Sequence, residues 1–108
     1  MAGLNKVTII GYVGKDPDMK YLASGDPVTE FSVGVTGWGE NAETEWFSCV
    51  AFKQTAETVG SYVTKGKQIY VEGRQKTDRW EDKETGQQRS RVKLIVSNVV
   101  LLGKKDEF

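Results

Sequence analysis

Two tryptophans lie in polar sequence, where a large apolar ring has little to pack against. Trp38 stands between two glycines in residues 37–41, and Trp80 stands in the charged run at residues 78–82. Tryptophans in protein cores are normally embedded in apolar sequence, so we predict that both rings are exposed. An exposed flat ring gains free energy by stacking on another planar group, and every base of a nucleic acid offers one. The two side chains therefore indicate a surface that stacks on bases.

Residues 44–52 form a predicted strand that carries aromatic rings on both faces. The period of two places Trp46 and Phe52 on one face, and it places Phe47 and Cys49 on the other. A sheet that buries one face leaves the other set of rings pointing outward. The strand by itself leaves two interpretations open, because either Trp46 and Phe52 or Phe47 could be the exposed set.

Basic residues gather in the second half of the chain, although all 108 residues together have a formal net charge of zero. Residues 65–93 hold nine Lys and Arg against five Asp and Glu, a net charge of +4, and the rest of the chain carries −4. Phosphate contacts normally supply most of the non-specific affinity for nucleic acid, and this segment is the predicted place for them. A solvated charged hairpin is the alternative interpretation. The residues predicted to contact phosphate are Arg74, Lys76, Arg79, Arg89 and Arg91.

The sequence offers little material for catalysis or metal binding. It has no histidine and one cysteine, Cys49, which excludes an internal disulfide and the usual zinc and copper ligand sets. Cys49 lies in an apolar strand and is predicted to be a core residue. The paired carboxylates at Asp16 and Asp18 lie in a turn, away from any predicted nucleophile. We expect no cofactor, no metal and no enzymatic activity.

Strands account for most of the predicted secondary structure. β-branched runs and alternation predict strands at residues 6–13, 19–22, 31–35, 44–52, 68–80 and 91–102, with a hairpin tip at residues 84–86. Residues 54–65 form the one predicted helix, in which Thr55 caps the start and Gly66 ends it. The apolar stripe of this helix consists of Ala56, Val59, Tyr62 and Val63.

The order of the main elements is β-β-β-α-β-β, with the short strand at residues 19–22 as an addition. Five strands with one helix between the third and the fourth is the arrangement of the OB-fold, an all-β Greek-key barrel that binds oligonucleotides and oligosaccharides. We predict a single OB-fold domain at residues 1–103, followed by a short charged end at residues 104–108.

Several stretches spread over residues 4–103 resemble the family of bacterial single-stranded DNA-binding proteins. Each stretch is short, and their order and spacing along the chain carry the resemblance. They are residues 4–7 (LNKV), 14–17 (GKDP) with Lys20 and Tyr21, 44–46 (TEW), 65–73 (KGKQIYVEG), and Trp80 on the long hairpin.

The resemblance implies a protein that binds single-stranded DNA without strong sequence preference, assembles as a homotetramer built from dimers, and acts in replication, recombination and repair. It also implies a cytoplasmic, nucleoid-associated protein, which agrees with the lack of an apolar run of about 20 residues and of a secretory signal. By position, Trp38, Trp46, Phe52 and Trp80 match base-stacking residues of the family. The positions that match subunit contacts are Lys6, Phe47, Tyr70 and Glu72.

The family usually carries a long tail rich in Gly, Pro and Gln, whose acidic, Phe-terminated tip recruits repair and replication proteins. This chain stops five residues after Gly103 and ends in Asp106, Glu107 and Phe108. Two interpretations stay open for these residues: a minimal tip, or a solvated charged terminus. An OB-fold accessory or protein-interaction subunit of replication restart is the alternative function, in which the exposed rings contact protein instead of bases.

Overall fold

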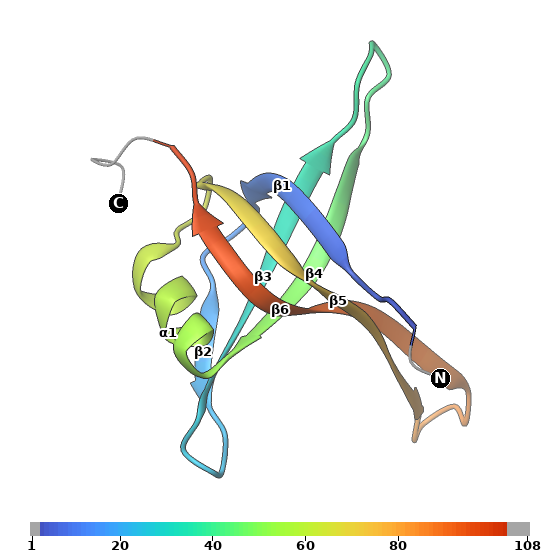
Figure 1. Ribbon diagram of the computed structural model, residues 1–108. Helices are drawn as coiled ribbons and strands as arrows, with labels where there is room; N and C mark the ends of the chain where they lie inside the picture. Colours follow the sequence, from blue (N-terminus) through green and yellow to red (C-terminus); the bar gives the residue numbers. More distant parts are fainter. Residues whose placement is uncertain (1–2, 104–108) are drawn as a thin grey trace.

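The computed structural model describes residues 3–103 of the chain, and these residues fold into one curved sheet with a helix across its open end (Figure 1). The predictions for residues 104–108 lie outside the described residues. The elements are β1 (Val7–Val13), β2 (Asp18–Tyr21), β3 (Pro27–Thr36), β4 (Thr44–Phe52), α1 (Lys53–Tyr62), β5 (Gln68–Glu81) and β6 (Gln88–Leu101).

The sheet curls into a partly open barrel because its first strand pairs on both sides. Strand β1 pairs with β5 along six residue pairs, and its end returns to β3 through Tyr12↔Gly34 and Val13↔Val33. Strands β4 and β6 run parallel and meet in only two pairs, Cys49↔Leu94 and Val50↔Ile95. The short β2 pairs with β3 alone and lies outside this ring. The predicted OB-fold is confirmed, with β2 inserted between its first two barrel strands.

The core occupies the inside of the barrel and the space beneath α1. Strand β3 alternates as predicted, with Phe31 and Val33 buried while Glu30 is exposed. Strands β5 and β6 add buried side chains, among them Ile69 and Leu94. Three residues of the predicted helical stripe are buried against this core: Ala56, Val59 and Val63.

The helix differs from its prediction at both ends. It begins at Lys53, whose φ of +55° turns the chain from β4 into α1 without a loop, and no side chain caps it, so the predicted capping role of Thr55 is wrong. It ends at Tyr62, which is exposed despite its place in the predicted stripe. Gly66 lies beyond the helix, in the turn into β5, where its N–H donates to Val13 O at 2.8 Å. Tertiary pairing with β1 thus determines how this segment turns.

The last two strands form a hairpin that is longer than predicted and projects from the barrel (Figure 1). Pairing continues out to Glu81↔Gln88, past the predicted strand ends at residues 80 and 91. Asp82 organises the tip: its side chain accepts the N–H of Glu84 at 2.9 Å, and its carbonyl accepts that of Gly86 at 2.8 Å. The hairpin therefore presents two paired strands to solvent well beyond the core.

A single buried hydroxyl joins the helix to the barrel, and its removal should lower stability. Thr29 has no exposed surface, and its Oγ1 donates to Ala56 O at 2.7 Å. Thr29→Val keeps the shape and removes this bond, so we expect the free energy of unfolding to fall by about 1–2 kcal/mol. Thr36→Val, at an exposed hydroxyl pair with Thr44, is the matched control and should change stability by less than about 0.5 kcal/mol. Urea unfolding of both variants checks this; equal stabilities would contradict it.

Candidate nucleic-acid interface

The outer face of β4 carries the two rings whose side the sequence left open. Trp46 is 61% exposed and Phe52 is 38% exposed, while Cys49 on the other face is buried. Phe47 is half-buried and packs against the core. Barrel closure thus places Trp46 and Phe52 outside and Phe47 inside.

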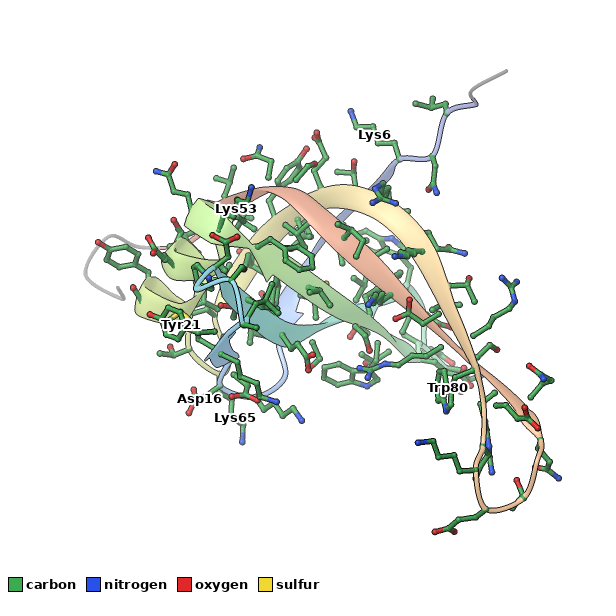
Figure 2. All side chains as sticks on the ribbon, turned by 90° about the horizontal axis from the view of Figure 1, so that it is seen from below. Lys6, Asp16, Tyr21, Lys53, Lys65 and Trp80 are labelled. Carbon is green, nitrogen blue, oxygen red and sulfur yellow. The ribbon has the colours of Figure 1, made fainter. Side chains whose placement is uncertain are left out.

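The other two predicted stacking rings lie on segments that project from the barrel. Trp38 is almost fully exposed in the β3–β4 loop, and Trp80 is 48% exposed on β5, far along the hairpin (Figure 2). The loop and the hairpin extend from the barrel in different directions (Figure 1). The four rings are therefore spread over a strand, a loop and a hairpin, as their sequence positions predict.

A groove of about 480 Å³ runs beside Trp46, between the barrel and the hairpin. Its lining comes from three parts of the chain: the β1–β2 loop with the start of β2, the strands β3 and β4, and the hairpin strands β5 and β6. Among the predicted site residues, Trp46 and Arg91 line this groove together, whereas Trp38, Phe52 and Trp80 lie outside it. The full lining is Lys15, Asp16, Asp18, Glu30, Phe31, Ser32, Trp46, Ser48, Cys49, Val50, Asp78, Arg91 and Lys93.

Strand register places most of the predicted cations on the same face of the hairpin as Trp80. Trp80 pairs with Arg89, Asp78 with Arg91, and Lys76 with Lys93, and cross-strand partners share a face. Arg74 has the same parity on β5 as these residues. Arg79 pairs with Ser90 and therefore lies on the opposite face, apart from the other four predicted phosphate contacts. All five predicted cations are exposed: Arg74, Lys76, Arg79, Arg89 and Arg91.

Two carboxylates compete for the positive charge of this face. Lys93 Nζ lies 2.6 Å from Asp78 Oδ2, and Arg89 Nε lies 3.4 Å from Asp82 Oδ2. The hydrogen bond from Lys93 is the main reason that the pKa of Asp78 is lowered, and the charge of Arg91 adds to the effect. Asp78 therefore stays ionised at neutral pH and partly neutralises the groove.

Sequence reasoning missed Lys15 and Lys93 as groove residues. Lys93 lies two positions after Arg91 on β6, so the period of two already places both side chains on one face. Lys15 lies in the β1–β2 loop, and no periodicity connects it with the hairpin. This loop is fixed by Asp16, whose Oδ1 accepts the N–H of Lys65 at 2.9 Å.

A second cluster lies on the outer face of β1, β5 and β6. Lys6 lies on the opposite side of the barrel from the groove residue Asp16 (Figure 2). Its Nζ is 3.8 Å from Glu72 Oε2, and the hydroxyl of Tyr70 donates to the same oxygen at 2.9 Å. This hydrogen bond raises the pKa of Tyr70 above its usual value. Three predicted subunit-contact residues thus share one surface, and Phe47 does not join them.

Apolar side chains surround this second cluster. The register aligns Ile10 with Tyr70 and Tyr70 with Val100, which makes a row across three strands. Ile10 is 51% exposed, Val100 is 46% exposed, and Tyr12 on the same face of β1 is exposed as well. Contiguous exposed apolar patches rimmed by polar residues mark surfaces that contact another molecule.

Neither a metal-binding cluster nor a membrane-spanning helix is found in the described part of the chain. Residues 3–103 bring no three Cys, Asp or Glu side chains together in a way that could hold a metal ion. Within the same residues, α1 is too short and too polar to span a membrane.

An OB-fold barrel that carries exposed rings, a groove and a basic hairpin face has the architecture of a domain that binds oligonucleotides or oligosaccharides. The model of the Single-strand binding protein family matches residues 4–102, and the chain belongs to this family. The resemblance predicted from the sequence motifs is confirmed.

Curated relatives cover nearly the whole chain. Single-stranded DNA-binding protein 1 of Xylella fastidiosa is 40% identical over 99% of this chain and 83% of its own length. The protein of the same name from Nostoc sp. is 39% identical over 96% of this chain and 87% of its own. That from Chlorobaculum tepidum is 36% identical over 96% of this chain and 68% of its own. These relatives are named as DNA-binding proteins and not as enzymes.

A solved structure supports the same fold. The Plasmodium falciparum SSB complex with ssDNA superposes with a TM-score of 0.87 at 29% identity, covering 95% of this chain and 98% of that one.

Cys49 is predicted to be unreactive in the native protein. It is 1% exposed, and burial raises its pKa from 9.0 to about 12. We expect no labelling by a thiol reagent at pH 8 until denaturant unfolds the chain, followed over time by absorbance. The unfolded thiol ionises above pH 9.0 while the folded one keeps its proton to about pH 12, so stability should fall as the pH rises through that interval. Rapid labelling of the native protein would refute the assignment.

Proposed function

We propose that this protein binds single-stranded DNA without strong sequence preference. The observation that carries the proposal is the placement of Trp46, a large and mostly exposed ring, in a groove that it shares with Arg91 and Lys93. A flat ring beside cations matches a path on which bases stack and phosphates are neutralised. Family membership and the names of the relatives support the same ligand.

Each part of the interface has a separate role in this proposal. Trp46 and Phe52 offer stacking surfaces on the barrel, and Trp38 and Trp80 extend the path onto the loop and the hairpin. The cations on the Trp80 face contact phosphate, namely Arg74, Lys76, Arg89, Arg91 and Lys93, and the last two of these also line the groove. Arg79 contributes from the opposite face only if the strand wraps around the hairpin.

The biological role that follows is protection of single strands during replication, recombination and repair. We place that role in the cytoplasm, in association with the nucleoid. No cofactor or catalytic step is needed, because stacking and charge neutralisation are equilibrium interactions.

A fluorescence titration with poly(dT) tests the proposal. Stacking brings bases onto the indole rings, so strong quenching is expected at micromolar or lower concentrations of DNA. An unchanged signal with all three tryptophans present would remove the claim and would favour the alternative, a protein-interaction subunit whose exposed rings contact protein.

Loss of either of two rings should weaken DNA binding by a measurable amount. Trp46→Ala and Trp80→Ala are each expected to cost about 1–3 kcal/mol of binding free energy, because each removes one stacking surface. Tyr62→Ala removes an exposed ring from α1, outside the groove, and should leave the affinity unchanged. Fluorescence anisotropy with a labelled oligo(dT) measures all three. Wild-type affinity in both tryptophan variants would contradict the assigned face.

We further propose that copies of the chain assemble through the outer face of β1, β5 and β6, as a homotetramer built from dimers. Within the described residues, β1 pairs with β3 only at Tyr12 and Val13, so residues 7–11 leave that edge of the strand without a partner strand. Unpaired strand edges join other strands readily. The apolar row at Ile10, Tyr70 and Val100 supplies surface to bury beside that edge.

Light scattering tests the assembly. The wild type should show four times the chain mass of 12.0 kDa. Ile10→Asp places a charge in the apolar row and should lower the mass, since a buried unpaired charge is costly. Tyr62→Asp places the same charge on α1 and should leave the mass unchanged. A monomeric wild type would remove the assembly proposal without affecting DNA binding.

A further inference from the structure

The far edge of the Trp46 indole occupies space that a side chain would otherwise fill at two glycines. A β-carbon on Gly34 would stand 2.9 Å from Trp46 Cζ3 and 3.0 Å from Cη2. A β-carbon on Gly14 would stand 2.5 Å and 3.0 Å from the same two atoms. Carbon atoms in favourable contact are about 3.5–4.0 Å apart, so a side chain at either glycine forces a shift, and the far end of the Trp46 side chain is the nearest group that can move.

Backbone pairing holds both glycines in place. Gly34 is the direct cross-strand partner of Trp46 in the β3–β4 ladder. Gly14 is attached to the same strand through its N–H, which donates to Ser32 O at 3.1 Å. Gly34 is buried although its position on β3 faces outward, which fits a ring lying against it. The glycine pair therefore belongs to the barrel surface under one end of the indole.

Other glycines of the barrel serve a different purpose. A β-carbon on Gly11 would strike the carbonyl oxygen of Gly34, and one on Gly73 would strike that of Ile95. Those two glycines allow backbones to approach each other. At Gly14 and Gly34, by contrast, the nearest atom is Trp46 Cζ3, and the next contacts are shared between Trp46 Cη2 and one small side chain, Ser32 Oγ at Gly14 or Thr44 Cγ2 at Gly34, each at 3.0 Å. Gly14 and Gly34 therefore leave room for a ring, which is a different role from letting a strand bend.

We propose that Gly14 and Gly34 are positioning residues that hold the Trp46 indole in one orientation, ready to receive a base. This inference rests on the proposed function, since it explains how the groove presents its stacking surface. One end of the ring lies over the glycine pair, and the residue as a whole stays 61% exposed. Ordering a side chain on binding costs free energy, so a ring already held in place binds more tightly.

The test uses a protein in which Trp46 is the only tryptophan, made by Trp38→Phe and Trp80→Phe. Gly34→Val should displace the indole, and Gly34→Ala should do so to a smaller extent. Time-resolved anisotropy of the DNA-free protein should then show faster local motion of Trp46, and the affinity for oligo(dT) should fall about tenfold, comparable to loss of one stacking surface. Gly37→Ala is the matched control, because its β-carbon would meet only Glu43 O at 3.9 Å.

A double-mutant cycle separates positioning from a general loss of structure. With Trp46→Ala already present, Gly34→Val should cause no further loss of affinity, measured with the other tryptophans intact. An equal loss in both backgrounds would overturn the proposal, as would unchanged anisotropy and affinity in a folded Gly34→Val protein. If Gly34→Val does not fold, the same comparisons are made with Gly34→Ala. If oligo(dT) does not bind at all, the proposed function fails, while the DNA-free anisotropy still tests the position of the ring.

Discussion

The return of β1 to β3 gives the sheet its curvature, and the inside and outside of the barrel follow from it. Gly11 lets the two backbones approach so closely that a β-carbon there would meet the carbonyl of Gly34, and the pairs at Tyr12 and Val13 close the curve. Once the sheet is curved, each strand has one face toward a packed interior and one toward solvent. The outward side of Trp46 and Phe52 and the groove beside Trp46 follow from that closure.

The hairpin contains ion pairs that its net charge does not reveal. Two of its cations have carboxylate partners within the hairpin: Lys93 is held by Asp78, and Arg89 by Asp82. A phosphate must compete with these internal partners, which is compatible with a chain of zero net charge. Under the proposed function, stacking supplies a larger share of the affinity than in a strongly basic protein, and binding depends less steeply on salt.

Local pattern was sufficient for some strands and fell short for others: β3 spans residues 27–36, where alternation predicted 31–35. Strand β4 spans residues 44–52, as predicted, and Cys49 is buried as its apolar setting indicated. Local pattern was insufficient at the ends of elements, because contacts with distant residues determine where an element begins and ends. The helix begins at Lys53 because the chain turns there directly from β4, and Gly66 is held by Val13 of another strand. A capping rule that uses only the sequence of the helix takes no account of those contacts.

Composition and spacing along the chain were enough to predict the element order, the family and the exposure of Trp38 and Trp80, because these are local properties that need no partner. The strand pattern could not predict the side of β4 on which Trp46 lies, since both faces carry rings; the family resemblance implied the outward side, and barrel closure places the ring there. Tertiary structure also brought Lys15 and Lys93 into one groove and placed Gly14 and Gly34 beneath the indole. These residues are far apart along the chain, and pairing between strands is the physical reason that they meet.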